Sequence, residues 1–426
     1  MTAEQSLYAR IALSVAASVA GVLLATSHRI HEPSSPRFRL IIFTALPFSR
    51  ALLYLFVFFV IRQPPRGDVI AFYFPEAKSI LSGLIPYRDF LSSYGPLNGY
   101  CNAAILRVWF SPLALIMFAI IVESFLLPMW FSIGHRLFEE RELRIASVLY
   151  LASPLSLQFV TIDGTNSICI ALLVALAMFL LIQERPLFSG GALAFSILTV
   201  KVLPLLYLPV YFVASSKRFR LLLGFVTTIV LGYAFFVLKG APVLQPLTRE
   251  GSMKTAGNLP YLVEAIVGFE VPARIWDLLV LVAVIAVWFF FAVKARHKSG
   301  PLTFRALYAT MPALTFALLL FSKKSYPTYL MFVLFPVCLL VGVTGRRTLL
   351  SFAVLQTAVI AAPSVWFTLT GCVSATLLHS EMVSGRPLAI CFVALQIAVV
   401  ATYAWLLWIS LLWIPGSNTP THLKWV

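Results

Sequence analysis

Residues 66–98 read RGDVIAFYFPEAKSILSGLIPYRDFLSSYGPLN and form a long connection in a chain that otherwise consists mainly of apolar runs. This stretch carries three carboxylates, Asp68, Glu76 and Asp89, together with several residues that favour turns. Long connections inside a compact domain usually have a function of their own. We therefore interpret residues 62–112 as a functional loop that leaves the membrane and returns to it.

The composition is typical of an integral membrane protein. Of the 426 residues, 60% are hydrophobic and 11% are charged, and the mean hydropathy is +0.93. A membrane-spanning helix needs about 20 apolar residues, and runs of this length recur along the sequence. We expect one all-α, polytopic membrane domain that comprises residues 1–426.

The net charge is +16, and the basic residues lie between apolar runs rather than in one polar block. This distribution argues against a nucleic-acid partner and is typical of the cytoplasmic loops of membrane proteins. The balance of Lys and Arg predicts that three loops, 62–112, 240–275 and 369–387, face the exterior. The positive charge that remains on that face favours an anionic substrate there.

Apolar runs predict the membrane-spanning helices. They lie at about 8–26, 40–61, 113–133, 145–160, 167–182, 221–238, 276–293, 304–321, 329–344, 348–368 and 388–412. The segment 97–110 is too short to cross at about 1.5 Å per residue, so we expect a re-entrant or interfacial helix. Basic residues flank both ends of 187–214, and two broken helices that meet near Lys201 would explain this. The total is about 11–13 helices.

Asp68 has two interpretations, which the residues alone leave open. A helical pattern of apolar residues follows it over 70–81, and Gly83 is a natural end for that helix. Asp68 is then an N-cap residue. Alternatively, it is a general base at the edge of the membrane. Residues 85–90 and 94–97 predict two turns that return the loop to the membrane.

Several cations have a functional interpretation beside a simpler one. Lys201 lies within an apolar stretch, where a charge usually marks a functional site but can also reach the interface. Arg50 is similar, and it can pair with Glu123 or cap a kink at Pro47. Lys323 and Lys324 bind phosphate in one interpretation and belong to a solvated turn in the other. Residues 161–166 predict a tight turn, from which Asp163 or Asn166 could contact a substrate.

Motifs for other chemistries are absent from the sequence. It contains no P-loop, no GxGxxG after a strand, no HExxH and no GxSxG. No DxD pair occurs, so the sequence indicates neither a divalent metal nor another cofactor. No nucleotide-binding domain is visible in the sequence, so a nucleotide-sugar donor is disfavoured.

The order of several short motifs resembles the GT-C superfamily of membrane glycosyltransferases, and most closely glycosyltransferase family 87 and its relative, GPI mannosyltransferase I. The motifs are Gly67-Asp68 with LSGLIPYRDF at 81–90, YGPL at 94–97, Ser153-Pro154 with the GTN turn at 164–166, VKVLP at 200–204 and SYPTY at 325–329. The resemblance covers most of residues 66–335. It implies a GT-C fold with catalytic loops on the outer face.

The resemblance also implies an activity. The chain would transfer a sugar, with mannose as the best candidate, from a polyprenyl-phosphate donor to a lipid or glycan acceptor with inversion. Asp68 matches the catalytic aspartate of the family. We expect the donor phosphate near Lys201, Lys323, Lys324 and Arg88. We expect acceptor or sugar contacts from Asp89, Glu76, Tyr87, Asp163 and Asn166.

Two other functions stay open from the sequence. One is a transporter or flippase of lipid-linked saccharides, which inverted repeats would favour, although no convincing repeat is visible. The other is a different GT-C transferase. The expected location in each case is the bacterial inner membrane, with the active site facing the exterior.

Overall fold

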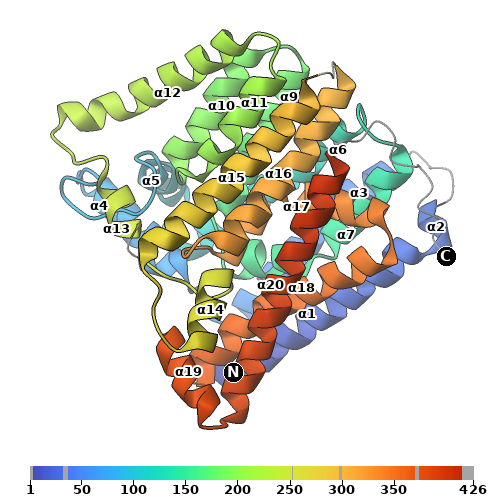
Figure 1. Cartoon of the computed structure of the whole chain (residues 1–426). Helices are drawn as coiled ribbons and strands as arrows, with labels where there is room; N and C mark the ends of the chain where they lie inside the picture. Colours follow the sequence, from blue (N-terminus) through green and yellow to red (C-terminus); the bar gives the residue numbers. More distant parts are fainter. Residues whose placement is uncertain (1–2, 32–36, 252, 297–299, 370–373, 415–426) are drawn as a thin grey trace. The chain divides into compact units, whose positions relative to one another are not determined.

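The computed structural model describes residues 3–31, 37–251, 253–296, 300–369 and 374–414. All the regular elements within these residues are helices (Figure 1). One isolated β-bridge joins Pro86 and Phe90. Eight helices in this part of the chain are long and apolar enough to cross a membrane, or nine if the bent pair Glu140–Leu151 and Pro154–Ile162 forms one span. The chain is therefore a polytopic membrane protein, as its composition predicts.

The chain divides into two compact units, each assembled from distant parts of the sequence. Unit 1 comprises Met1–Ser34, Phe138–Leu155 and Ser252–Val426. Its helices are α1 (Ala3–Thr26), α2 (His28–His31), α7 (Glu140–Leu151), α14 (Leu259–Val267), α15 (Ala273–Ala295), α16 (Pro301–Phe321), η5 (Pro327–Val333), α17 (Leu334–Thr344), α18 (Arg346–Leu369), α19 (Ala375–Val383) and α20 (Pro387–Trp413). Helix α16 packs against α15 and α20, and α18 packs against α1 and α20.

Unit 2 comprises Ser35–Leu137 and Ser156–Gly251, and the short helix α8 (Pro154–Ser156) lies at its border with unit 1. Its helices are α3 (Arg37–Leu55), η1 (Phe56–Val60), η2 (Val69–Tyr73), α4 (Phe74–Leu81), α5 (Asn98–Val108), α6 (Pro112–Gly134), η3 (Leu157–Ile162), α9 (Ser167–Ile182), α10 (Pro186–Thr199), η4 (Leu203–Tyr207), α11 (Leu208–Ala214), α12 (Arg218–Leu238) and α13 (Gln245–Glu250). The helix α10 packs against both α9 and α12 (Figure 1).

Glycines allow α10 and α12 to approach closely. A Cβ atom added to Gly190 would lie 2.0 Å from the carbonyl oxygen of Leu221, and one added to Gly224 would lie 1.9 Å from that of Leu187. Small residues at such crossings let helix backbones pack together in membranes, where burial of apolar side chains supplies little driving force. This packing holds α10 in place up to its end at Thr199.

The segment 187–214 is broken as predicted. Helix α10 ends at Thr199, and η4 and α11 begin only at Leu203 and Leu208. Lys201 lies in the break. Pro204 has no amide hydrogen to donate to the carbonyl of Val200, so a regular helix cannot continue through this point. The short helix predicted over 97–110 is also present as α5, whereas its position at a membrane interface stays a prediction.

The number of membrane-spanning helices depends on how the shorter apolar helices are counted. Besides the candidate spans, the described residues contain shorter apolar helices at Ser167–Ile182, Pro186–Thr199 and Leu203–Ala214. The expectation of about 11–13 helices depends on whether these cross the membrane, so it stays a prediction. The single-domain interpretation likewise stays a prediction beside the two compact units.

Arg50 makes the partnership that the sequence suggested. Its Nε lies 3.3 Å from Glu123 Oε2, and both side chains are buried. Ser156 joins the pair: its hydroxyl accepts from Arg50 Nη2 at 2.7 Å and donates to Glu123. Because a buried charge is tolerated only when paired and hydrogen-bonded, we assign Arg50 a structural role in joining α3, α6 and α8.

Candidate active site

Asp68 occupies the N-cap position of η2, but its side chain caps no backbone amide of that helix. Gly67 precedes it with a φ of +62°, a left-handed conformation that glycine adopts without strain. The helix continues into α4 and stops before Gly83, whose φ is +86°. The predicted helix and its end are therefore confirmed, whereas capping does not account for the Asp68 side chain.

Two tyrosines hold the carboxylate of Asp68 instead. Tyr94 donates its hydroxyl hydrogen to Oδ2 at 3.0 Å, and Tyr73 donates to the same oxygen at 3.4 Å. The other oxygen, Oδ1, accepts no hydrogen bond from the described residues, and the side chain is partly exposed. Burial, and with it the charge of Asp68, raises the pKa of both phenols well above the usual value. Both tyrosines thus remain donors at neutral pH.

Tyr94 also contacts Lys201. The Nζ atom of Lys201 lies over the Tyr94 ring, 4.9 Å from its centroid, which is within the range of a cation–π contact. The charge of Lys201 is within electrostatic reach of that of Asp68. One aromatic side chain thus contacts both the carboxylate and the ammonium group.

Backbone hydrogen bonds explain this arrangement. Gly95 donates its N–H to Val200 O and Leu97 donates to Leu198 O, both at 2.8 Å. These carbonyls belong to the broken end of α10, which cannot pair them within a regular helix. A Cβ atom on Gly95 would lie 2.2 Å from Ile197 O, so this approach requires glycine. The turn at 94–97 therefore completes the broken helix and carries Tyr94 to Lys201.

Asp163 lies on the tight turn between η3 and α9. Arg66 Nε donates to its Oδ1 at 2.9 Å, and Gln158 Nε2 donates to its Oδ2 at 2.7 Å. Burial raises the pKa of the Asp163 carboxyl, while Arg66 and Gln158 lower it again. At Gly164, with φ of +61°, an added Cβ would lie 2.9 Å from Val69 Cγ2. The turn is therefore packed against the residue that follows Asp68.

Asn166 is connected to Asp68 through Tyr73. Its backbone N–H donates to the Tyr73 hydroxyl at 3.4 Å, and its Nδ2 donates to Asn98 Oδ1 at 3.1 Å. The structure thus gathers Asp68, Asp163, Asn166 and Lys201, four of the residues predicted for the site, within unit 2. Asn166 thus contacts Tyr73, one of the two residues that hold Asp68.

Glu76 and Tyr87, two further residues predicted for the site, are both buried. The Glu76 side chain accepts a hydrogen bond from Ser92 Oγ at 3.1 Å, and its residue is 6% exposed. Burial raises the pKa of Glu76 to about 7, and Ser92 and Asn98 oppose the rise. Tyr87, with a φ of 66°, donates its hydroxyl hydrogen to the carbonyl of Tyr94. Tyr87 therefore supports the backbone of the turn that carries Tyr94.

Arg88 and Asp89 pair with each other on the surface. Arg88 Nε and Nη2 donate to Asp89 Oδ1 and Oδ2, each at 2.8 Å, and Ile85 N–H donates to Oδ2 at 2.7 Å. The Arg88 hydrogen bonds lower the pKa of Asp89. This mutual pairing explains the turn at 85–90 without a substrate, so a contact from Arg88 to the donor phosphate would have to break it.

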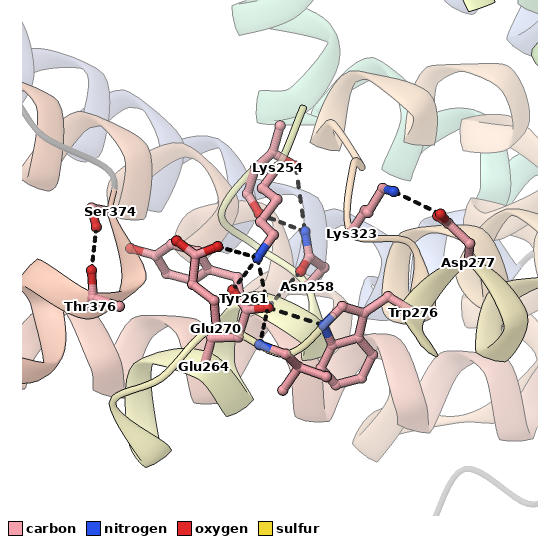
Figure 2. Close-up of polar contacts among 12 residues, drawn as sticks. Lys254, Asn258, Tyr261, Glu264, Glu270, Trp276, Asp277, Lys323, Ser374 and Thr376 are labelled. Carbon is pink, nitrogen blue, oxygen red and sulfur yellow. Dashed lines mark hydrogen bonds and ion pairs between the residues drawn. The ribbon is translucent and has the colours of Figure 1, made fainter. Parts of the chain in front are cut away.

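Lys323 and Lys324 belong to unit 1. Figure 2 shows Lys323 extended toward Asp277, and its Nζ lies 2.7 Å from Asp277 Oδ2. Lys324 Nζ lies 5.7 Å from the centroid of the Tyr326 ring. Asp277 was not considered from the sequence, because it lies at the start of an apolar span. The described contacts thus give Lys323 a carboxylate partner of its own.

A second polar cluster in unit 1 is formed by side chains between Lys254 and Trp276 (Figure 2). Buried Glu264 accepts from Lys254 Nζ at 3.0 and 3.1 Å, from Trp276 Nε1 at 3.1 Å and from Val271 N–H at 3.2 Å. Lys254 also pairs with Glu270 at 3.0 Å. These contacts provide hydrogen-bond donors to both carboxylate oxygens of Glu264. We therefore interpret the cluster as a structural element that stabilises the conformation of the loop.

The group in unit 2 has the parts of an acid–base site. A partly exposed carboxylate with one unengaged oxygen can accept a proton, and a neighbouring ammonium can stabilise a developing anion. Sequence reasoning missed Tyr73 and Arg66, and treated Tyr94 only as part of a turn. The available signal was their proximity in the chain, since Arg66 and Tyr73 lie within one or two helical turns of Asp68.

Comparison with known proteins adds no assignment. No family model matches the chain, and no curated protein matches it.

Proposed function

We propose that the chain is a membrane glycosyltransferase of the GT-C type, most similar to glycosyltransferase family 87. It transfers a sugar, with mannose as the best candidate, from a polyprenyl-phosphate donor to a lipid or glycan acceptor. The reaction takes place on the external face of a bacterial inner membrane. The observation that carries this proposal is that Tyr94 contacts both the Asp68 carboxylate and the Lys201 ammonium.

The proposed chemistry assigns a step to each group. Asp68 Oδ1 takes the proton from the acceptor hydroxyl as that oxygen attacks the anomeric carbon. The bond between the anomeric carbon and the phosphate oxygen breaks at the same time, so the configuration inverts. Lys201 stabilises the negative charge that develops on the departing lipid phosphate. Tyr94 and Tyr73 keep the carboxylate oriented through Oδ2.

The positions of Asp68 and Lys201 also suit a lipid-linked donor and a water-soluble hydroxyl group of the acceptor. Asp68 lies on a loop outside the candidate spans, whereas Lys201 lies in the break between two apolar helices. A lipid phosphate has its charge next to an apolar chain, so a cation at a helix break suits it. A sugar hydroxyl arrives from water and suits the partly exposed carboxylate.

The direct test uses the purified protein in lipid, radiolabelled polyprenyl-phosphate mannose and an extract of bacterial envelope lipids. We expect labelled mannose to move to a lipid or glycan, with an anomeric configuration opposite to that of the donor. Retention of configuration would contradict the single-step mechanism. Movement of intact donor across the bilayer without transfer would favour a transporter or flippase instead.

A further inference from the structure

Arg66 carries buried donors that the protein itself does not use. Its Nη1 and Nη2 atoms are buried, and neither has a hydrogen-bond partner among the described residues. Buried polar groups are nearly always hydrogen-bonded, and an unpartnered donor on a charged group is especially unfavourable. Both atoms are covered in this structure, so a ligand would satisfy them once the groups that cover them move aside.

The remaining nitrogen fixes how the guanidinium lies. Arg66 Nε donates to Asp163 Oδ1 at 2.9 Å, and Gln158 already donates to Asp163 Oδ2 at 2.7 Å. Each oxygen of Asp163 therefore has its own donor, and the two Nη atoms take no part in this pairing. Because a guanidinium is planar, anchoring Nε sets the plane of the unused fork.

The fork belongs to the same group as Asp68. Arg66 is two residues before Asp68 in the chain, and the charge of Asp163 is within electrostatic reach of that of Asp68. The Gly164 turn is packed closely against Val69. These contacts join the loop that carries Arg66 and Asp68 to the turn that carries Asp163.

Two of the other cations considered for the donor phosphate, Arg88 and Lys323, have carboxylate partners of their own. Arg88 uses two nitrogens on Asp89, and Lys323 pairs with Asp277. Arg66 differs because its pairing with Asp163 occupies Nε alone and leaves two parallel donors. Such a fork matches two oxygens of a phosphate group in a bidentate arrangement.

We propose that the Arg66 fork binds two oxygen atoms of a phosphate group, and that this group is the phosphate of a polyprenyl-linked substrate. The identity of the substrate rests on the proposed function, whereas the phosphate site rests on the contacts of Arg66. Asp163 and Gln158 then act as positioning residues that hold the fork.

The test measures binding to the full-length protein in nanodiscs of phosphatidylcholine. The probes are polyprenyl monophosphate, the matching uncharged polyprenol and inorganic phosphate as a competitor. We expect the parent to prefer polyprenyl monophosphate to polyprenol. Arg66→Gln should weaken binding of the phosphorylated lipid roughly 10- to 100-fold and leave polyprenol binding unchanged. The matched control is Arg107→Gln, at an exposed arginine in the last turn of α5, which should bind as the parent does.

A second variant keeps the test decisive if Arg66→Gln fails to fold. Arg66→Lys retains the charge but loses the fork, and we expect it to bind polyprenyl monophosphate at least about fivefold more weakly. Parent-like binding by either variant would overturn the proposal. Competition by inorganic phosphate with no contribution from the polyprenyl chain would overturn the lipid source.

This experiment uses no sugar, so its outcome is separate from that of the transfer assay. Loss of binding in Arg66→Gln without any sugar transfer by the parent would support the phosphate site and contradict the proposed function. Sugar transfer by the parent together with full binding by Arg66→Gln would support the proposed function and contradict the phosphate site.

Discussion

Tyr94 donates a hydrogen bond to Asp68 across 3.0 Å, although 26 residues separate the two in the chain. The same tyrosine lies beneath the ammonium group of Lys201. Its position depends on a backbone pairing between the turn at 94–97 and the broken end of α10. The orientation of the Asp68 carboxylate is thus linked to the break in a helix that is distant in sequence.

The tyrosine pair predicts a graded effect on catalysis. In Tyr94→Phe the ring contact with Lys201 remains, but the 3.0 Å hydrogen bond to Asp68 is lost. Hydrogen bonds to charged groups contribute about 1.5–3 kcal/mol, so we expect kcat for sugar transfer to fall roughly 10-fold or more. Tyr73→Phe removes only the 3.4 Å bond and should reduce kcat less. A larger effect of Tyr73→Phe would contradict this ranking.

Gly95 should tolerate no side chain. In Gly95→Ala the new Cβ would lie 2.2 Å from Ile197 O and 2.4 Å from Leu198 O, so the turn must separate from the broken helix. We expect sugar transfer to be lost and the melting temperature in detergent to fall. Gly83→Asn is the matched control, because its Cβ meets open space and Asn tolerates positive φ. Full activity of Gly95→Ala would disprove the close approach.

The buried ion pair predicts a large loss of stability without a role in chemistry. Glu123→Ala would leave the guanidinium of Arg50 buried without its carboxylate. Breaking such a pair costs about 3–5 kcal/mol, which a denaturant titration in detergent would measure. The double variant Arg50→Met with Glu123→Leu should recover most of that loss. A parent-like unfolding curve for Glu123→Ala would contradict the structural assignment.

Glu76 predicts a pH dependence of stability. Its pKa in the folded protein is about 7, against an ordinary value of 4.5. The folded state therefore binds the proton more tightly than the unfolded state, so stability is greatest below pH 4.5 and falls as pH rises through about 7. The total change is on the order of 3 kcal/mol.

Melting temperatures between pH 4 and pH 8 would measure this, with Glu76→Gln as the comparison. The Gln side chain does not ionise, so its melting temperature should fall less between these pH values. Equal slopes for both proteins would place the titration elsewhere.

The sequence predicted the elements that obey local rules. Apolar runs gave most of the spans, prolines and Lys201 gave the break after α10, and Gly83 gave the end of α4. The pairing of Arg50 with Glu123 followed from the cost of a buried charge. These features depend on single residues or on neighbours in the chain, which is why they are visible without a structure.

The contacts that assemble the site were not predictable in the same way. The capping and the catalytic interpretations of Asp68 both require an aspartate just before a helix. Only the direction of its side chain distinguishes them. Gly95 and Val200 are joined by a backbone hydrogen bond, and backbone groups carry no sequence signal apart from the glycine itself. Lys323 was interpreted as a possible phosphate ligand because it lies on an expected outer loop. Its partner Asp277 was not foreseen, because it lies within an apparently uniform apolar run.

The central claim is that Asp68 removes the proton from the acceptor. We would measure donor binding and sugar transfer in parallel for the parent and Asp68→Asn, both in lipid, with polyprenyl-phosphate mannose as donor. The amide has nearly the same size and can still accept hydrogen bonds from Tyr94 and Tyr73, but it cannot take the proton. We expect parent-like donor binding, with transfer reduced at least about 100-fold. Transfer at the parent rate by Asp68→Asn would contradict this claim.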